Sequence, residues 1–166
     1  MEYNHLISLR LAKESDFDSF YSIKSEKPDI YWGGHLSTPN KGRLYDFFKK
    51  HLDKDSFRRI YVVTLYDSEV IGYVYLDRID EKRAEVSIGI SEKFSGNGYG
   101  KLAICQCGGV AKQLGYKMLV AYIREDNMRS QNLFSHIGFS KTDIQISRCI
   151  ENLNEKGILY MYMKRL

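Results

Sequence analysis

A cluster of small residues near the middle of the chain could do chemistry through its backbone; it reads S-G-N-G-Y-G-K over residues 95–101. So much glycine does not build a packed element, so the backbone must turn tightly there. Apolar side chains alternate over residues 86–90, as in a strand, and recur at steps of three and four over residues 102–114, as in a helix. A strand, a glycine turn and a helix point free N–H groups and the positive end of the helix dipole at one spot. This order predicts an anion site, most often for a phosphate.

Two known phosphate-binding signatures do not explain this turn. A Walker A loop requires glycine at its first position and Ser or Thr at its last, where the chain has Ser95 and Leu102. The dinucleotide fingerprint G-x-G-x-x-G fits weakly, because the third glycine comes one residue early. Glycines that only permit a tight turn, with no ligand, are the plain structural alternative.

The turn and a later segment together resemble a known family. G-N-G-Y-G between a strand and a helix, followed by N-M-R-S-Q-N-L-F-S-H-I-G-F over residues 127–139, is similar to the GCN5-related N-acetyltransferases, the GNAT family. The resemblance covers nearly the whole chain, because the order of the expected elements also matches. In that family the loop R/Q-x-x-G-x-G/A binds the pyrophosphate of acetyl-coenzyme A (acetyl-CoA), so the resemblance implies acetyl-CoA as co-substrate.

The resemblance implies a set of cofactor contacts, with one departure. Ser95 stands where the family usually has Arg or Gln, so backbone N–H groups must carry more of the binding. Lys101, Arg124 or Arg129 could add positive charge. The strand before the loop would bond the acetyl carbonyl and the pantetheine arm through its backbone, and Asn127 resembles the family asparagine near the thioester. The implied cofactor-binding residues are Ile88, Ile90, Ser95, Gly96, Asn97, Gly98, Tyr99, Gly100, Lys101, Asn127 and Ser130.

Acetyl transfer to an amine needs a neutral amine, a polarised carbonyl and a stabilised leaving thiolate. Glu85 begins the strand before the loop, where several members of the family place a carboxylate that removes the amine proton directly or through water. Partial burial beside apolar neighbours would raise the pKa of this carboxylate and suit that role. The alternative is an exposed Glu85 paired with Arg83 or Lys82.

The general acid is marked less clearly. Many relatives carry tyrosine where this chain has Phe134, and phenylalanine cannot donate a proton. Ser130 or a water is the expected replacement, unless the thiolate leaves without help, since its basicity is modest. His136 lies two positions after Phe134 and is expected to turn away from it on the helix. The predicted catalytic residues are therefore Glu85 and Ser130.

The resemblance implies that residues 24–50 match the helices and loop that cover the acceptor in the family, and residues 28–42 within them contain both prolines and the only tryptophan and show no periodicity. A long irregular stretch in a compact domain is usually functional or mobile. Tyr31, Trp32 and His35 could stack on or hydrogen-bond to a flat polar acceptor, although Trp32 could equally fix this stretch to the core. The chain has no acidic run for a polyamine and no groove signature for a peptide.

The predicted function is transfer of an acetyl group from acetyl-CoA to the primary amine of a small molecule, by direct attack in a ternary complex. A nucleotide-linked amino sugar is the first choice of acceptor, and the N-terminus of a protein or peptide is the second. Two hypotheses belong to other classes. One is a non-catalytic acyl-CoA sensor, motivated by Ser95 and Phe134, and the other is a nucleotide-binding module unrelated to acetylation.

The elements that must position these residues follow in order along the chain. Alternating spacing predicts strands over residues 5–11, 60–65, 70–76, 84–90, 118–123, 140–149 and 158–164. Helical spacing predicts helices from Ser15 to before Pro28, around residues 44–52, over 102–114 and over 127–136. With the resemblance, this order predicts an α+β fold of GNAT type. Its three-layer α/β arrangement has about four helices flanking a mixed, mostly antiparallel central sheet of about seven strands.

Length and composition set the outer limits. The chain of 166 residues, 43% hydrophobic and 28% charged, is expected to form one soluble domain over residues 1–166. A net charge of +4 with scattered Lys and Arg does not require nucleic acid. The lack of a long apolar run and of a signal-like start predicts no membrane contact and a cytoplasmic location. Cys105, Cys107 and Cys149 are expected to be reduced structural thiols, no metal site is expected, and a homodimer is left open.

Overall fold

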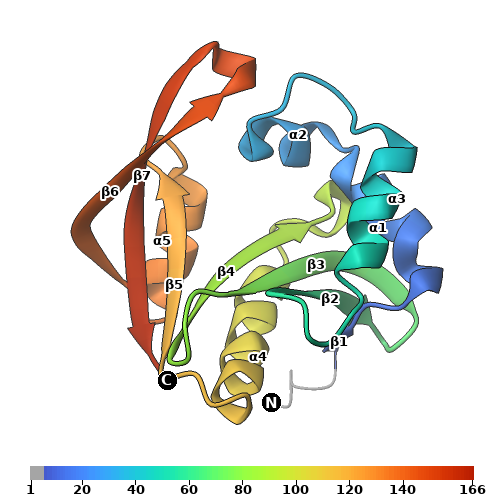
Figure 1. Ribbon diagram of the computed structural model, residues 1–166, viewed down its shortest axis with the longest axis horizontal. Helices are drawn as coiled ribbons and strands as arrows, with labels where there is room; N and C mark the ends of the chain where they lie inside the picture. Colours follow the sequence, from blue (N-terminus) through green and yellow to red (C-terminus); the bar gives the residue numbers. More distant parts are fainter. Residues whose placement is uncertain (1–5) are drawn as a thin grey trace.

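A seven-stranded sheet forms the middle of the molecule, and helices cover both of its faces (Figure 1). The computed structural model describes residues 6–166. The strands lie in the order β1-β2-β3-β4-β5-β7-β6, and among the described residues only the central pair, β4 and β5, is parallel. The strands are β1 (Ile7–Leu11), β2 (Arg58–Leu65), β3 (Glu69–Arg78), β4 (Arg83–Ile90), β5 (Met118–Arg124), β6 (Ser140–Ile150) and β7 (Glu155–Arg165).

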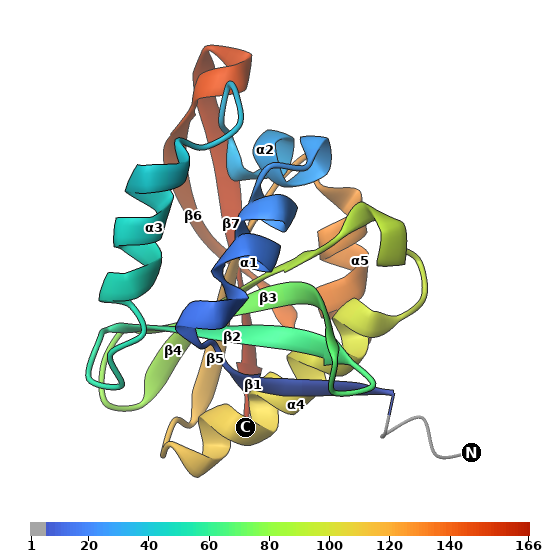
Figure 2. The same cartoon turned by 90° about the vertical axis from the view of Figure 1, so that its right-hand side faces the viewer.

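Five α-helices and three short 3₁₀ turns connect these strands within the described range. Helices α1 and α3 pack on one face of the sheet, and α4 and α5 pack on the other, as two views at right angles show (Figures 1 and 2). The predicted three-layer arrangement with a mostly antiparallel sheet is confirmed. The helices are α1 (Phe17–Lys24), α2 (Lys27–Gly33), α3 (Lys41–Lys50), α4 (Tyr99–Gln113) and α5 (Met128–His136), and the 3₁₀ turns are Glu14–Asp16, Glu92–Phe94 and Glu151–Leu153.

The larger hydrophobic core lies between the sheet and the pair α4 and α5. Val74 of β3 and Val86 of β4 are at most 1% exposed, and Cys107 of α4 belongs to the same cluster. Burial raises the pKa of the Cys107 thiol to about 12, so this cysteine stays neutral. Cys105 and Cys149 are exposed, and all three cysteines are free thiols, as predicted.

A second, aromatic core fixes α1 and α3 on the opposite face. Phe20 of α1 and Phe48 of α3 are fully buried, with their ring centroids 4.9 Å apart. Phe17 contacts Phe48 at 5.5 Å, and Phe20 meets the ring of Tyr73 in β3 edge to face at 5.3 Å. This core therefore determines where α1, and α2 after it, stand above β3.

The parallel contact between β4 and β5 is short and controls the shape of the sheet. It pairs residues 83–85 with residues 118–120 and then stops. β4 stays paired with β3 as far as Ile90, and β5 stays paired with β7 as far as Arg124, so the two strands diverge (Figure 1). Residues 86–90 consequently have one edge whose backbone N–H and C=O groups are free for a ligand.

Residues 28–42 correct the prediction of a wholly irregular stretch. They begin inside α2, where Pro28 occupies the first turn, a position that suits proline because an N–H there has no helical partner. Gly34 ends the helix with a φ of 79°, in the left-handed region that glycine adopts freely. Within the described chain, no residue of α2 is buried, so the helix does not need the apolar stripe by which the other helices were predicted. It raises the expected count of about four helices to five.

The remaining predicted elements are confirmed, with shifts at their ends. The first strand begins at Ile7, and residue 5, where it was expected to start, lies outside the described residues. α4 begins at Tyr99, three residues earlier than the apolar spacing indicates, and Asn127 caps α5 rather than opening it. Among residues 6–166, no helix is both long and apolar enough to cross a membrane. The same residues contain no group of three or more His, Cys, Asp or Glu side chains arranged to hold a metal.

Replacing Phe48 with alanine is expected to destabilise the fold by about 3–5 kcal/mol, because it opens a cavity in the aromatic core. Leu36→Ala is the matched control, since Leu36 is 72% exposed and should change stability by less than about 0.5 kcal/mol. Urea denaturation followed by circular dichroism measures both. Equal unfolding midpoints for the two variants would contradict this account of the core.

Candidate active site

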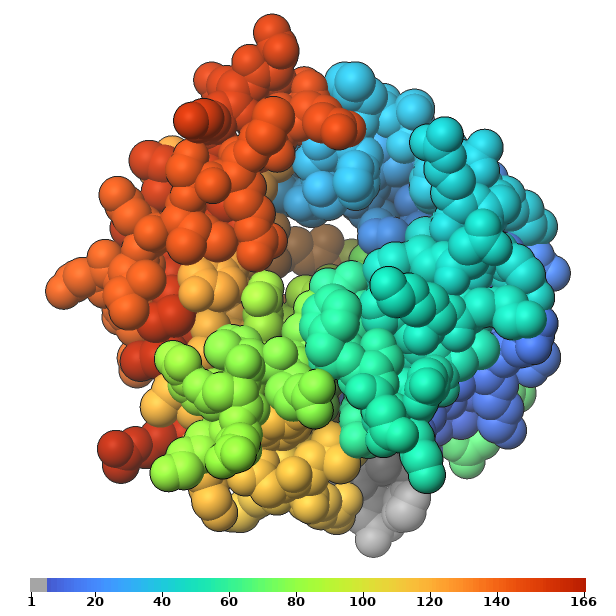
Figure 3. Space-filling view, viewed as in Figure 1, coloured from blue at the N-terminus to red at the C-terminus, as the bar shows by residue number. Residues whose placement is uncertain are grey.

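A cavity of about 720 Å³ opens where β4 and β5 diverge. The glycine turn and the start of α4 line one end, and the other end runs over β3 and β4 toward α2 and β6. Figure 3 shows a hollow in this face, bordered by the orange-red β6–β7 hairpin and by α2 in blue. The cavity therefore joins the predicted anion site to Glu85.

The glycine turn has the shape of an anion cradle. Gly96 and Gly98 have φ values of +84° and +80°, in the left-handed region that favours glycine. A Cβ atom placed on either residue would meet no described atom within 4 Å, so the space beside the turn is open. In the described chain α4 has no side-chain cap, which leaves the N–H groups of its first turn free. The turn thus fits a phosphate group.

A charged side chain from another helix reaches this turn. Arg129 of α5 donates a hydrogen bond from Nη2 to Oγ of Ser95, and both residues line the cavity. The guanidinium therefore lies beside the residue at which the family pattern has a long polar side chain, and it can pair with an anion held by the turn. Lys101, in the first turn of α4, lines the cavity as well.

Two other polar residues expected to face the cofactor are already engaged. Arg124, which is 6% exposed, donates to both carboxylate oxygens of Asp126 at 2.9 and 2.7 Å. It also donates to the backbone oxygen of Tyr31 at 3.3 Å, so less of its charge is available to a phosphate than its sequence position indicates. Asn97 donates from Nδ2 to the backbone oxygen of Ser95 at 3.3 Å, so its side chain holds the turn together.

β4 and α5 supply the residues expected along the cofactor arm. Ile88 and Ile90 line the cavity, in the part of β4 that has separated from β5. Asn127 caps α5 by accepting a hydrogen bond from the N–H of Ser130 at 3.1 Å, and both residues line the cavity. The structure therefore brings these four residues and the glycine turn to one wall.

The same wall shows which residues could act as a general acid. Phe134 lines the cavity, is 3% exposed and packs edge to face on Phe139, so the position of the family tyrosine holds only an apolar ring. His136 is exposed, and its Nδ1 lies 2.6 Å from the backbone oxygen of Asn132, which agrees with the predicted turn away from the site. Ser130, the residue predicted to act as the acid, lines the cavity and carries a hydroxyl that can donate a proton.

Glu85 lies at the point where β4 and β5 part. Its side chain is 25% exposed, and its Oε1 is 3.8 Å from Nη2 of Arg148 in β6. Burial raises the pKa of this carboxyl, an effect that the charge of Arg148 opposes and the charge of Asp77 reinforces. A raised pKa suits a general base, because proton transfer is most efficient when the pKa of the base is near the working pH.

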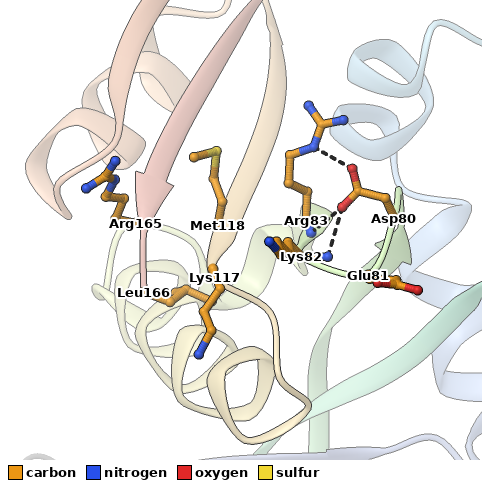
Figure 4. Close-up of a pocket in the computed structure, with 8 residues that line it drawn as sticks. All are labelled: Asp80, Glu81, Lys82, Arg83, Lys117, Met118, Arg165 and Leu166. Atoms are coloured by element: carbon orange, nitrogen blue, oxygen red, sulfur yellow. Dashed lines mark hydrogen bonds and ion pairs between the residues drawn. The ribbon is translucent and has the colours of Figure 1, made fainter.

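The alternative pairing of Glu85 with Arg83 or Lys82 is wrong. Nε of Arg83 lies 2.7 Å from Oδ2 of Asp80 in the turn between β3 and β4, as Figure 4 shows. This ion pair borders a second hollow of about 790 Å³, beside the first residue of β5 and the end of β7. The second hollow is at the opposite end of β5 from the cavity, and the described residues lining it include none of the predicted site residues.

The sequence-based site omits a polar surface of the sheet at the far end of the cavity. Here β3 and β4 form what we call the polar floor, in which Tyr73, Tyr75 and Asp77 lie opposite Gly89, Ser87 and Glu85. Val74 and Leu76, which alternate with the three β3 residues, are buried on the other face. This alternation over residues 73–77 is the signal that could have identified the floor from the sequence.

Two closed ion pairs border the polar floor. Arg58 of β2 binds both oxygens of Asp77, at 2.8 and 2.5 Å. Lys24 donates to Oδ1 of Asp29 at 2.5 Å and to the hydroxyl of Tyr73 at 3.0 Å, while Tyr73 donates to Oδ2 of Asp29 at 2.7 Å. Burial and the charge of Asp29 raise the pKa of Tyr73, which therefore stays protonated. All five side chains line the cavity.

The predicted acceptor residues fall into two groups. Trp32 lines the cavity, whereas the lining residues found within 6–166 do not include Tyr31 and His35. The rings of Tyr31 and Trp32 meet edge to face at 4.8 Å, and the guanidinium of Arg124 lies over both. His35 faces Glu151 of the β6–β7 hairpin, with Nδ1 and Oε2 3.9 Å apart. Contact of Trp32 with an acceptor stays a prediction.

α2 and the residue after it also touch the tip of the β6–β7 hairpin. The N–H of Glu151 donates to the backbone oxygen of Gly34 at 3.0 Å, and Nδ2 of Asn152 donates to the backbone oxygen of Tyr31 at 3.0 Å. We call these two contacts the α2–hairpin bridge. The bridge links the two halves of the molecule across the gap between β4 and β5, so protein surrounds the acceptor end of the cavity.

A comparison with protein families identifies the chain. The family model described as an acetyltransferase (GNAT) domain matches residues 7–140. The chain belongs to the GNAT acetyltransferase family. Membership of the GNAT family confirms the resemblance seen in the sequence, with its acyltransferase class and its use of acetyl-CoA as co-substrate.

Individual GNAT relatives are distant. The uncharacterized N-acetyltransferase YycN of Bacillus subtilis is 22% identical over 93 residues, which are 54% of this chain and 60% of that protein. The ribosomal protein bS18-alanine N-acetyltransferase of Haemophilus influenzae is 23% identical over 130 residues, 78% of this chain and 79% of that protein. A solved spermidine N-acetyltransferase from Vibrio cholerae, in complex with CoA and spermine, is 18% identical over 96% of this chain and 95% of its own, with a TM-score of 0.84. The solved structure shares the fold, and its name does not determine the acceptor of this chain.

Replacing Arg129 with glutamine is expected to raise the Kd for CoA about tenfold, because a charge-assisted contact beside the glycine turn is lost. Isothermal titration with CoA measures the change, and it should shrink at high salt. The matched control is Lys93→Gln, since Lys93 lies two residues before Ser95 but pairs with Glu69 at 3.2 Å. Similar losses of CoA affinity in both variants would show that general charge, and not the contact of Arg129, matters.

Proposed function

We propose that this GNAT protein transfers the acetyl group of acetyl-CoA to the primary amine of a small molecule, by direct attack while both substrates are bound. The observation that carries the proposal is one continuous cavity that joins the open glycine turn to the carboxylate of Glu85. Substrates that enter from its two ends would meet beside residues 86–90, where the edge of β4 is free.

Different groups along the cavity bind the coenzyme, orient it and transfer protons. N–H groups of the glycine turn, with Arg129 and Lys101, hold the diphosphate, and the free edge of β4 orients the arm. The coenzyme supplies the thioester, whose carbonyl carbon bonds to the amine nitrogen as the carbon–sulfur bond breaks. Glu85 accepts the proton that the amine loses, and Ser130 or water returns a proton to the leaving sulfur.

Enclosure of the acceptor end favours a small acceptor. The α2–hairpin bridge limits what can reach Glu85 from that side. The polar floor offers carboxylates and hydroxyls, and the cations Arg58 and Lys24 border it, which suits a polar amine better than an apolar one. A nucleotide-linked amino sugar, a homodimer and a cytoplasmic location stay predictions from the sequence.

A protein N-terminus is the second candidate acceptor. The similarity to the ribosomal protein bS18-alanine N-acetyltransferase favours it. A free N-terminus is a primary amine at the end of an extended chain. Such a chain is narrow enough to enter the acceptor end of the cavity, which the α2–hairpin bridge encloses.

Replacing Glu85 with glutamine is expected to lower kcat about 100-fold or more, because the general base is removed. Release of free thiol from acetyl-CoA, followed across a panel of primary amines, measures the rate. In the unmodified protein kcat/KM should fall as the pH drops through the pKa of Glu85, which burial places above the ordinary glutamate value. In the Glu85→Gln variant, the part of the pH profile that reports protonation of Glu85 should be absent. The part that reports protonation of the acceptor amine should remain.

The matched control is Glu81→Gln, since Glu81 is an exposed carboxylate in the turn between β3 and β4. It should keep the rate and pH profile of the unmodified protein. Tight binding of CoA without thiol release for any amine would support the non-catalytic sensor instead. Tight binding of ATP but not of CoA would support a nucleotide-binding module.

A further inference from the structure

Of the three ion pairs on the acceptor side of the cavity, two are closed and one is open. Arg58 with Asp77, and Lys24 with Asp29, are joined by direct hydrogen bonds of 2.8 Å or less. Glu85 and Arg148 stand 3.8 Å apart, beyond hydrogen-bond distance, and within residues 6–166 the side chain of Arg148 donates no hydrogen bond to another residue. The open pair is therefore the one that has capacity for a ligand.

The open pair has a definite shape. Arg148 lies over the ring of Tyr122 at 5.7 Å and lines the cavity, and its side chain is 52% exposed, so a ligand can reach it. Glu85 is the more buried member and lies beside the free edge of β4. An acceptor amine at Glu85 would thus have a guanidinium at its side, on the path toward solvent.

We infer that the acceptor is an α-amino acid, with its amine at Glu85 and its carboxylate on Arg148. The two groups of an α-amino acid are joined through one carbon, which matches a carboxylate and a guanidinium 3.8 Å apart. Guanidinium binds carboxylate through two parallel hydrogen bonds, and the ligand dipole would then run opposite to that of the open pair. This inference rests on the proposed function and names its substrate class.

The charge of the acceptor end argues against a polycation. Apart from Arg124, whose charge is paired with Asp126, three cations and three anions line this end of the cavity: Lys24, Arg58 and Arg148, and Asp29, Asp77 and Glu85. A polyamine is stabilised by an excess of carboxylates, which this balanced set does not provide. A peptide N-terminus has a neutral amide in place of the carboxylate, so it would offer Arg148 a carbonyl oxygen but no negative charge to pair with.

The test compares standard L-amino acids with the corresponding amino acid amides as acceptors for thiol release from acetyl-CoA. Each pair differs by one negative charge, and kcat/KM is corrected for the fraction of neutral amine, because amides have the lower amine pKa. At least one acid is expected to be used about tenfold better than its amide. Arg148→Gln should remove this preference by lowering kcat/KM for the acid and not for the amide.

Two further variants show whether the guanidinium itself is responsible. Arg148→Lys keeps the charge but not the paired donors, so it should retain part of the preference. Arg165→Gln removes an exposed arginine at the far end of β7, beside the second hollow, and should leave the preference intact. Circular dichroism should show that all of these variants are folded.

The outcomes separate this inference from the proposed function. Equal use of acids and amides, or a preference that survives Arg148→Gln, overturns the inference and leaves an N-acetyltransferase. A general preference for amides overturns it in favour of a peptide N-terminus. Absence of thiol release with every amine overturns the proposed function, and the inference with it.

Discussion

The short parallel contact between β4 and β5 is the constraint on which the site depends. After residues 85 and 120 the two strands follow different partners, so the sheet splits while each half keeps its own hydrogen bonds. Backbone groups inside a protein need partners, and here one edge of β4 meets a cavity in place of a strand. The split also sets the position of Glu85, the last paired residue, at the apex of that cavity.

The two ends of the cavity differ in how they achieve binding. At the glycine turn the groups proposed to bind are mostly backbone N–H groups, presented by left-handed glycines and an uncapped helix start, and Arg129 approaches Ser95 from α5. At the acceptor end side chains do the work, and most of the charge is neutralised in closed pairs. In the proposed function, the coenzyme would therefore be recognised mainly by backbone groups, and the acceptor by the few side chains that are not in closed pairs.

Local pattern was sufficient for the strand, turn and helix around residues 86–114, because glycine content and apolar spacing report directly on backbone shape. It was not sufficient for α2, in which no residue is buried, because such a helix needs no apolar stripe that a sequence pattern could reveal. Contacts between residues distant in sequence could not be predicted either. The approach of Arg148 to Glu85, for example, depends on the register of β6 on β7. The polar floor was partly predictable. The alternation of residues 73–77 could be recognised in the sequence, but the ion pair between Arg58 and Asp77 could not.

The α2–hairpin bridge has a mechanical consequence. The halves of the sheet on either side of the split are joined at one end by a brief strand contact and at the other by the bond between Gly34 and Glu151. Together these two links close a ring of protein around the acceptor end of the cavity, and the bridge sets the width of the opening. The bridge combines one bond between backbone groups with one bond from the side chain of Asn152, so only part of its strength depends on a side chain. A change in the length of the hairpin would thus alter the size of molecule admitted, while the glycine turn and Glu85 keep their geometry.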